Sequence, residues 1–156
     1  MRPMNNPKKN ILLLGYGEMG HCMEHLFSSQ HNVAIWDPYF KGKLEPINLD
    51  ATAKAADFVI FCTPTVAIFE LAQLIEPHLK PTCISLSMAK SLDAAGRTAP
   101  EALQQGLNES ARFGLLYGPM IAEEIMAGKP GFAILATTFP DVATAALSLF
   151  GDTILK

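Results

Sequence analysis

A chain of 156 residues, 49% of them hydrophobic, is long enough to bury a core and has the size of one domain. Twelve Lys and Arg residues against fifteen Asp and Glu give a net charge of −3, and the basic residues form no stripe, which argues against a nucleic-acid surface. No apolar run approaches the ~20 residues that span a bilayer, and the polar first residues lack a signal-peptide core, so we expect a soluble, cytoplasmic protein.

The first expected strand, Ile11–Leu14, leads directly into a glycine-rich loop. The loop has the spacing G-x-G-x-x-G and consists of Gly15, Tyr16, Gly17, Glu18, Met19 and Gly20. Gly15 permits a tight turn, Gly17 lets the backbone approach a pyrophosphate, and Gly20 lets the next helix pack close to the strand. That helix, beginning near Glu18, directs unpaired N–H groups at the phosphates. We therefore predict that the loop binds a dinucleotide, with the Glu18 carboxylate turned to solvent.

The second expected strand, Val33–Trp36, ends at an acidic residue. Asp37 follows Gly15 by 22 residues, close to the ~20 expected for the acid that binds the adenine ribose. An alternative interpretation is that Asp37 opens the Asp37-Pro38 turn. We favour the ribose role, because the tip of this strand is where the ribose hydroxyls would lie. A carboxylate there repels a 2′-phosphate, so the predicted cofactor is NAD rather than NADP.

Strand and helix signals alternate along the rest of the chain. Strands are expected at 58–61, 82–86, 112–117 and 132–136, and helices at 66–75, 100–105, 120–127 and 141–149. The turn-rich stretch 37–50 is expected to replace a helix with a loop. This alternation predicts an α/β fold with a Rossmann-type, doubly wound, mostly parallel sheet in a single three-layer αβα domain.

Ligands in such sheets bind beyond the carboxyl ends of the strands, where the strand order reverses. Besides the glycine loop and Asp37, this edge receives Thr63 and Pro64, residues 87–91, and the Gly118-Pro119 pair. An alternative interpretation is that Thr63-Pro64 is simply a turn that ends the strand. Its backbone is still expected to border the cofactor.

The cysteines and histidines do not have the spacing of a metal site. Cys22, Cys62 and Cys83 are widely separated among apolar residues, which indicates buried thiols rather than a zinc site or a disulfide framework. His21 and His25 lie four residues apart on one expected helix, but we do not expect them to bind a metal. No metal is predicted.

Four landmarks occur in an order that resembles one known family. They are the glycine loop, the apolar strand closing on Pro64, the segment Ala89-Lys90-Ser91-Leu92-Asp93 with Gly96-Arg97 after it, and the run from Gly118 to Pro130. The last matches G-P-x-x-A-x-E-x-x-x-G-x-P at every fixed position. This pattern resembles the NAD-dependent glycerol-3-phosphate dehydrogenases over nearly the whole chain.

The resemblance implies specific roles. Lys90 matches an active-site lysine near the carbonyl of dihydroxyacetone phosphate, where an ammonium group polarises the carbonyl while hydride arrives from NADH. The Gly118-Pro119 turn would lie beside the nicotinamide, with Ala122 in the cofactor site and Glu124 orienting the loop. The family usually has Gly after that lysine, whereas this chain has Ser91, which would shift the loop if a positive φ is required there.

The resemblance also implies a second domain. Family members continue into a helical domain that carries the principal catalytic lysine and holds the substrate phosphate. We therefore expect residues 1–156 to be the NAD-binding domain, with the helical domain absent from this chain, of an oxidoreductase that interconverts sn-glycerol 3-phosphate and dihydroxyacetone phosphate. The expected partners are a phosphorylated small molecule and a second copy of the chain, with no nucleic acid or membrane. The alternatives are another two-domain dehydrogenase of the 6-phosphogluconate dehydrogenase-like group and a non-catalytic nucleotide-binding or sensing module.

Overall fold

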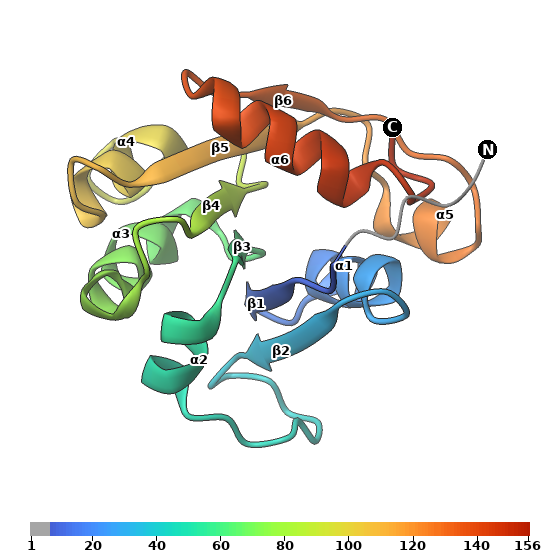
Figure 1. Cartoon of the computed structure of the whole chain (residues 1–156), viewed down its shortest axis with the longest axis horizontal. Helices are drawn as coiled ribbons and strands as arrows, with labels where there is room; N and C mark the ends of the chain where they lie inside the picture. Colours follow the sequence, from blue (N-terminus) through green and yellow to red (C-terminus); the bar gives the residue numbers. More distant parts are fainter. Residues whose placement is uncertain (1–6) are drawn as a thin grey trace.

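A six-stranded sheet runs through the middle of the computed structural model, which describes residues 7–156 (Figure 1). The strands are β1 Asn10–Leu14, β2 Asn32–Trp36, β3 Phe58–Phe61, β4 Ile84–Ser87, β5 Arg112–Tyr117 and β6 Ile134–Ala136. Their order is β2-β1-β3-β4-β5-β6. The first five strands are parallel, and β6 pairs antiparallel with β5.

Helices cover both faces of the sheet. They are α1 Glu18–Phe27, α2 Leu49–Ala55, α3 Thr65–Ile75, α4 Ala99–Gly106, α5 Ala122–Met126 and α6 Pro140–Phe150, with a 3-10 helix at Glu76–His78. Side chains of α1, α5 and α6 pack in one apolar cluster, and those of α2, α3 and α4 pack in another on the opposite face (Figure 1). The predicted three-layer α/β fold with a mostly parallel sheet is confirmed.

Burial on both faces explains why the central strands are apolar at every position. In β1, Ile11 and Leu13 enter the cluster of α1, α5 and α6, whereas Leu12 and Leu14 enter the other. All four are at most 2% exposed. A parallel strand between two helical layers needs such a continuous apolar run, because neither face meets water.

The strand order places the ligand-binding crevice. From β1 the chain passes through α1 to β2 on one side, and it then crosses to β3 on the other side of β1. The carboxyl ends of β1 and β3 therefore diverge into helices on opposite faces, which is the topological switch point of a doubly wound sheet. The glycine loop leaves β1 here and Cys62 follows β3, and the Cys62 N–H donates to the Leu14 carbonyl at 2.8 Å.

β4 and β6 each begin two residues later than predicted, and two helices differ more from the sequence prediction. The expected loop over 37–50 ends at Asn48, and α2 was not predicted; Asn48 caps it by accepting the Ala51 N–H at 2.9 Å. The helix expected at 120–127 begins at Ala122, because the Met120 N–H closes a tight turn onto the Gly118 carbonyl at 2.8 Å. None of the helices among the described residues is long and apolar enough to cross a membrane.

Candidate functional site

A cavity of about 600 Å³ opens at the switch point. Its walls come from the loops after β1, β2 and β3 and from one side of α3. The lining residues are Gly15, Tyr16, Gly17, Trp36, Asp37, Pro38, Tyr39, Cys62, Thr63, Pro64, Val66, Ala67, Glu70, Leu71 and Leu74. Six of the residues expected at the cofactor are thus together, whereas Glu18, Met19, Gly20, Lys90 and Ala122 do not line this cavity.

The three loop glycines differ in their surroundings. Gly15 has φ +95°, and a Cβ on it would lie 2.7 Å from Thr63 Cγ2. A Cβ on Gly20 would collide with the Gly15 carbonyl oxygen, so α1 approaches the loop at a distance that only glycine permits. Gly17 faces open space, with no heavy atom within 4 Å of the position of a Cβ. This space over the loop is the room that a pyrophosphate requires.

Hydrogen bonds leave the start of α1 available to an anion. The Gly15 N–H donates to the Trp36 carbonyl at 2.9 Å, and the Tyr16 N–H donates to Asp37. Gly17 is the N-cap of α1 and supplies no side-chain cap to the first-turn N–H groups. Glu18 is exposed, as expected, and Met19 packs against the core beneath the loop.

Asp37 joins the loops that follow β1 and β2. One carboxylate oxygen accepts the Tyr16 N–H at 2.8 Å and the other accepts the Tyr39 N–H at 2.8 Å. Asp37 therefore does form the turn of the alternative interpretation, and it also lines the cavity. Because each carboxylate oxygen can accept more than one hydrogen bond, both oxygens keep acceptor capacity for a ribose hydroxyl.

An aromatic cluster holds the glycine loop against α1, and sequence reasoning missed it. The Tyr16 ring stacks on His21 at 3.7 Å between centroids and meets the edge of Phe40 at 4.9 Å. The Tyr16 hydroxyl donates to the Glu24 carboxylate. Burial, together with this hydrogen bond and the charge of Glu24, raises the pKa of Tyr16 to about 12. The cluster thus fixes the loop after β2 through Phe40.

Thr63 and Pro64 form the third wall at the end of β3. Pro64 is the N-cap of α3. Among the buried side-chain polar atoms of the described residues, Thr63 Oγ1 alone has no hydrogen-bond partner. An unpartnered hydroxyl beside the glycine loop, the open space over Gly17 and the Asp37 carboxylate all fit a dinucleotide bound in this cavity.

The lysine segment lies on a neighbouring part of the same edge. Lys90 is exposed, and its Nζ donates to the Gly118 carbonyl at 3.4 Å. Thr65 Oγ1 donates to the Ser91 carbonyl at 2.9 Å, which ties the segment to α3. All positive φ angles among the described residues belong to glycines. Ser91 therefore has a negative φ, and the presence of Ser in place of the family's Gly causes no backbone strain here.

An ion pair between a buried Asp93 and a partly buried Arg97 closes the lysine segment. Asp93 pairs with Arg97, with 2.6 Å between Nε and the carboxylate oxygen, and Arg97 stacks over Phe69 at 3.8 Å. Burial alone would raise the pKa of Asp93, but hydrogen bonds from the Arg97 N–H and guanidinium and from the Ala95 N–H lower it. Gly96 supplies a φ of +79° in this turn. The Asp93 to Arg97 part of the resemblance is therefore a structural turn beside the lysine.

The Gly118 to Pro130 run turns sharply and then packs on α1. Gly118 has φ +144°, and a Cβ on it would lie 2.5 Å from the Phe132 carbonyl oxygen. Ala122 is buried in the apolar cluster that contains side chains of α1, so in this structure it packs the start of α5 against the core. Glu124 lies 3.4 Å from Lys129 Nζ.

The three thiols have raised pKa values; Cys22 and Cys83 are buried, and Cys62 is partly buried. Burial raises the pKa of Cys22 to about 11 and that of Cys83 to about 12, and it raises the pKa of Cys62 further. A raised pKa keeps a thiol protonated and weakly nucleophilic. Within residues 7–156, no three His, Cys, Asp or Glu side chains gather in a group that could hold a metal ion.

A doubly wound sheet with a glycine loop, a strand-end carboxylate and a cavity at the switch point defines a dinucleotide-binding domain of the Rossmann class. The chain belongs to the family described as NAD-dependent glycerol-3-phosphate dehydrogenase N-terminus, whose model matches residues 43–143. That match includes Lys90 and the Gly118 to Pro130 run, whereas the glycine loop and Asp37 precede it.

Relatives with similar sequences agree with this assignment. The glycerol-3-phosphate dehydrogenase (NAD(P)+) of Brachyspira hyodysenteriae is 28% identical over 78% of this chain and 43% of its own length. The protein of the same name from Saccharophagus degradans is 27% identical over 93% of this chain and 47% of its own length. The chain therefore spans about half the length of these relatives.

The fold is shared more widely than the sequence. Glycerol-3-phosphate dehydrogenase from Coxiella burnetii superposes with a TM-score of 0.78 at 17% identity, over 96% of this chain and 53% of that chain. A Plasmodium falciparum pyrroline carboxylate reductase with NADP bound superposes with a TM-score of 0.72 at 15% identity, over 98% and 58% of the two chains. At these identities the likeness concerns the fold alone.

Proposed function

We propose that this chain is the NAD-binding part of an oxidoreductase that interconverts sn-glycerol 3-phosphate and dihydroxyacetone phosphate. The observation that carries the proposal is the contact between Lys90 Nζ and the Gly118 carbonyl, at 3.4 Å. It joins the two most specific parts of the family resemblance at the carboxyl edge of the sheet. β4 and β5 are adjacent parallel strands, so the fold brings the segments that follow them together at this edge.

Each residue of the site has a defined task in this proposal. When bound, the nicotinamide group supplies or accepts the hydride. The glycine loop and the first turn of α1 hold the pyrophosphate, and Asp37 holds the adenine ribose. The Lys90 ammonium polarises the substrate carbonyl and stabilises the negative charge that develops on its oxygen. The Gly118 carbonyl orients that ammonium.

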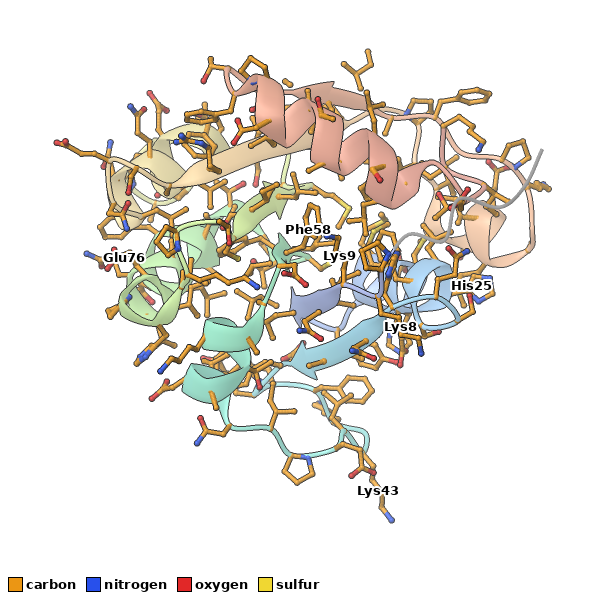
Figure 2. All side chains as sticks on the ribbon, viewed as in Figure 1. Lys8, Lys9, His25, Lys43, Phe58 and Glu76 are labelled. Carbon is orange, nitrogen blue, oxygen red and sulfur yellow. The ribbon has the colours of Figure 1, made fainter. Side chains whose placement is uncertain are left out.

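The proposed cofactor is NAD in preference to NADP. The Asp37 carboxylate would repel a 2′-phosphate. A nearby lysine could offset this repulsion only if its ammonium group faced the site. Lys43, at the tip of the loop after β2, points away from the domain (Figure 2). The relatives are named for both cofactors, and the preference proposed for this chain rests on Asp37.

The remainder of the proposed active site lies outside residues 1–156. Because the chain spans about half the length of its relatives, we assign the groups that hold the substrate phosphate to a second, helical domain. Exposed apolar side chains around the Gly118 turn, Ile121, Met126 and Phe132, are 52%, 45% and 58% accessible and form the proposed contact surface for that domain or for a second copy. We further propose a cytoplasmic location, in keeping with three free thiols.

The direct test is a titration of the purified chain with NADH and then with NADPH. Trp36 lines the cavity next to Asp37, so its emission reports on binding, and calorimetry provides a second readout. We expect saturable quenching that occurs at lower concentrations of NADH than of NADPH. Absence of binding by both methods would overturn the proposal and favour a fold that serves as an interaction module.

A further inference from the structure

The hydroxyl of Thr63 is in an unusual position for a buried polar group. Within residues 7–156 it is the one buried side-chain oxygen or nitrogen that makes no hydrogen bond. Leaving such a group unsatisfied destabilises the folded state, whereas an apolar group of the same shape would not have this effect. The position nevertheless carries Thr and not Val, which suggests that the hydroxyl has a partner in another state of the protein.

No polar group near Thr63 forms a hydrogen bond with its hydroxyl in this side-chain conformation, and the nearby donors are engaged elsewhere. The Gly15 N–H is used by the Trp36 carbonyl, and the Tyr16 N–H by the Asp37 carboxylate. On the other side, Thr65 Oγ1 is engaged with Ser91. Thr63 also lines the cavity, so a ligand bound there can supply the missing partner.

The methyl group of Thr63 has a separate role, because it packs against the glycine loop in this structure. Its Cγ2 lies against the glycine loop, 2.7 Å from the position that a Cβ on Gly15 would occupy. This contact places Thr63 across from the first glycine of the loop, between the carboxyl ends of β1 and β3. In a doubly wound fold the pyrophosphate crosses this point, with the nicotinamide ribose beyond it.

We propose that the Thr63 hydroxyl donates a hydrogen bond to an oxygen in the pyrophosphate–ribose segment of the bound dinucleotide. This inference rests on the proposed function. Rotation of the side chain to another staggered position moves Oγ1 from its buried place toward the cavity. Nucleotide binding then removes an unsatisfied group and forms a new hydrogen bond at the same time. Thr63 is accordingly a binding residue whose hydroxyl disfavours the nucleotide-free state.

The test compares two substitutions that separate the hydroxyl from the methyl group. Thr63→Val keeps the shape and removes the hydroxyl, so we expect the free protein to be at least as stable as the wild type in urea unfolding. The Kd for NADH and for ADP-ribose, measured by calorimetry, should rise about fivefold to tenfold, as loss of one hydrogen bond of about 1 to 1.4 kcal/mol produces. Thr63→Ser keeps the hydroxyl and loses the methyl contact with Gly15, so it should lower stability while nucleotide affinity changes less than twofold.

AMP is the matched probe for position on the nucleotide. It lacks the pyrophosphate and the second ribose, so its Kd should be the same for the wild type and Thr63→Val. Equal weakening of AMP and ADP-ribose would overturn the assigned position. Unchanged ADP-ribose affinity in Thr63→Val would overturn the inference while leaving the proposed function intact. Failure of the wild type to bind NADH or ADP-ribose at all would instead overturn the proposed function, and this inference with it.

Discussion

Asp37 combines a structural task with a recognition task in one carboxylate. Two backbone N–H groups, from Tyr16 and Tyr39, orient it before any ligand arrives. Such preorganisation lowers the cost of ordering the site when the ribose binds. The same bonds mean that a change at this residue affects both the loop and the nucleotide.

We expect Asp37→Ser to weaken NADH binding about tenfold or more, the effect of losing a hydrogen bond of about 1.5 kcal/mol or more to a charged group. NADPH should lose less, because repulsion of its 2′-phosphate is removed as well. Titrations of both cofactors measure the change. Asp141→Ser, on α6 and outside the cavity, is the control and should leave both affinities unchanged. An unaltered ratio of the two affinities in Asp37→Ser would contradict the ribose role.

Gly17 and Gly15 respond differently to a side chain. Gly17 has φ −79° and open space around it, so Gly17→Val should retain the fold and its circular dichroism spectrum while nucleotide binding is lost. Gly15 has φ +95° and contacts Thr63, so Gly15→Ala should destabilise the free protein by about 1 to 3 kcal/mol in urea unfolding. If Gly17→Val binds NADH normally, the pyrophosphate does not lie over this loop.

At the scale of elements, Asp57 ties together the amino ends of three strands. It lies just before β3, accepts the Asn10 N–H of β1 at 2.8 Å, and pairs at 2.6 Å with Lys80, which precedes β4. Burial by itself raises the pKa of Asp57, but the hydrogen bonds and charge of Lys80 and the Asn10 N–H lower it overall.

A carboxyl group with a lowered pKa in the folded state stabilises the fold above its unfolded pKa. This contribution decreases as the pH falls toward the folded pKa, and it is lost below that value. We expect Asp57→Asn to reduce the free energy of unfolding by about 1 kcal/mol at pH 7. Urea unfolding at a series of pH values should show wild type and variant converging below the ordinary carboxyl pKa. A difference that stays constant with pH would exclude the charge of Asp57 as its cause.

Elements with a strong local pattern were predictable from sequence, and those set by their neighbours were not. β3 is a continuous apolar run, β5 is apolar apart from Arg112 and Gly114, and both have the predicted bounds. α2 has Ala53 as its buried residue and depends on the Asn48 cap, so hydrophobic periodicity gave no signal for it. The antiparallel direction of β6 was equally invisible, because the same apolar residues suit a strand of either direction.

The candidate site divides in the same way. The glycine spacing and Asp37 are local patterns, and the structure brings them to one cavity. The stacking of Tyr16 on His21 and Phe40 depends on where the loop after β2 folds back, and no spacing rule encodes it. The missing partner of Thr63 is a property of the packed structure as a whole, since it requires knowing every neighbouring donor and acceptor.

At the scale of the whole molecule, the cavity joins three loops that leave the sheet at the switch point. These loops begin at Gly15, Asp37 and Cys62, and they lead into helices on both faces of the sheet. A ligand in the cavity therefore contacts segments from both apolar clusters. Because such a ligand binds the folded state and not the unfolded chain, it stabilises the domain as a unit.

This linkage gives a last prediction that separates cofactor binding from the proposed chemistry. NADH at 100 times its Kd should raise the free energy of unfolding by about 2.7 kcal/mol, and thermal unfolding should shift to higher temperature. Gly17→Val should show no shift. Lys90→Ala should show the full shift, because Lys90 reaches Gly118 and does not line the cavity. A reduced shift in Lys90→Ala would mean that this ammonium holds the cofactor, and its assignment to the substrate carbonyl would then be wrong.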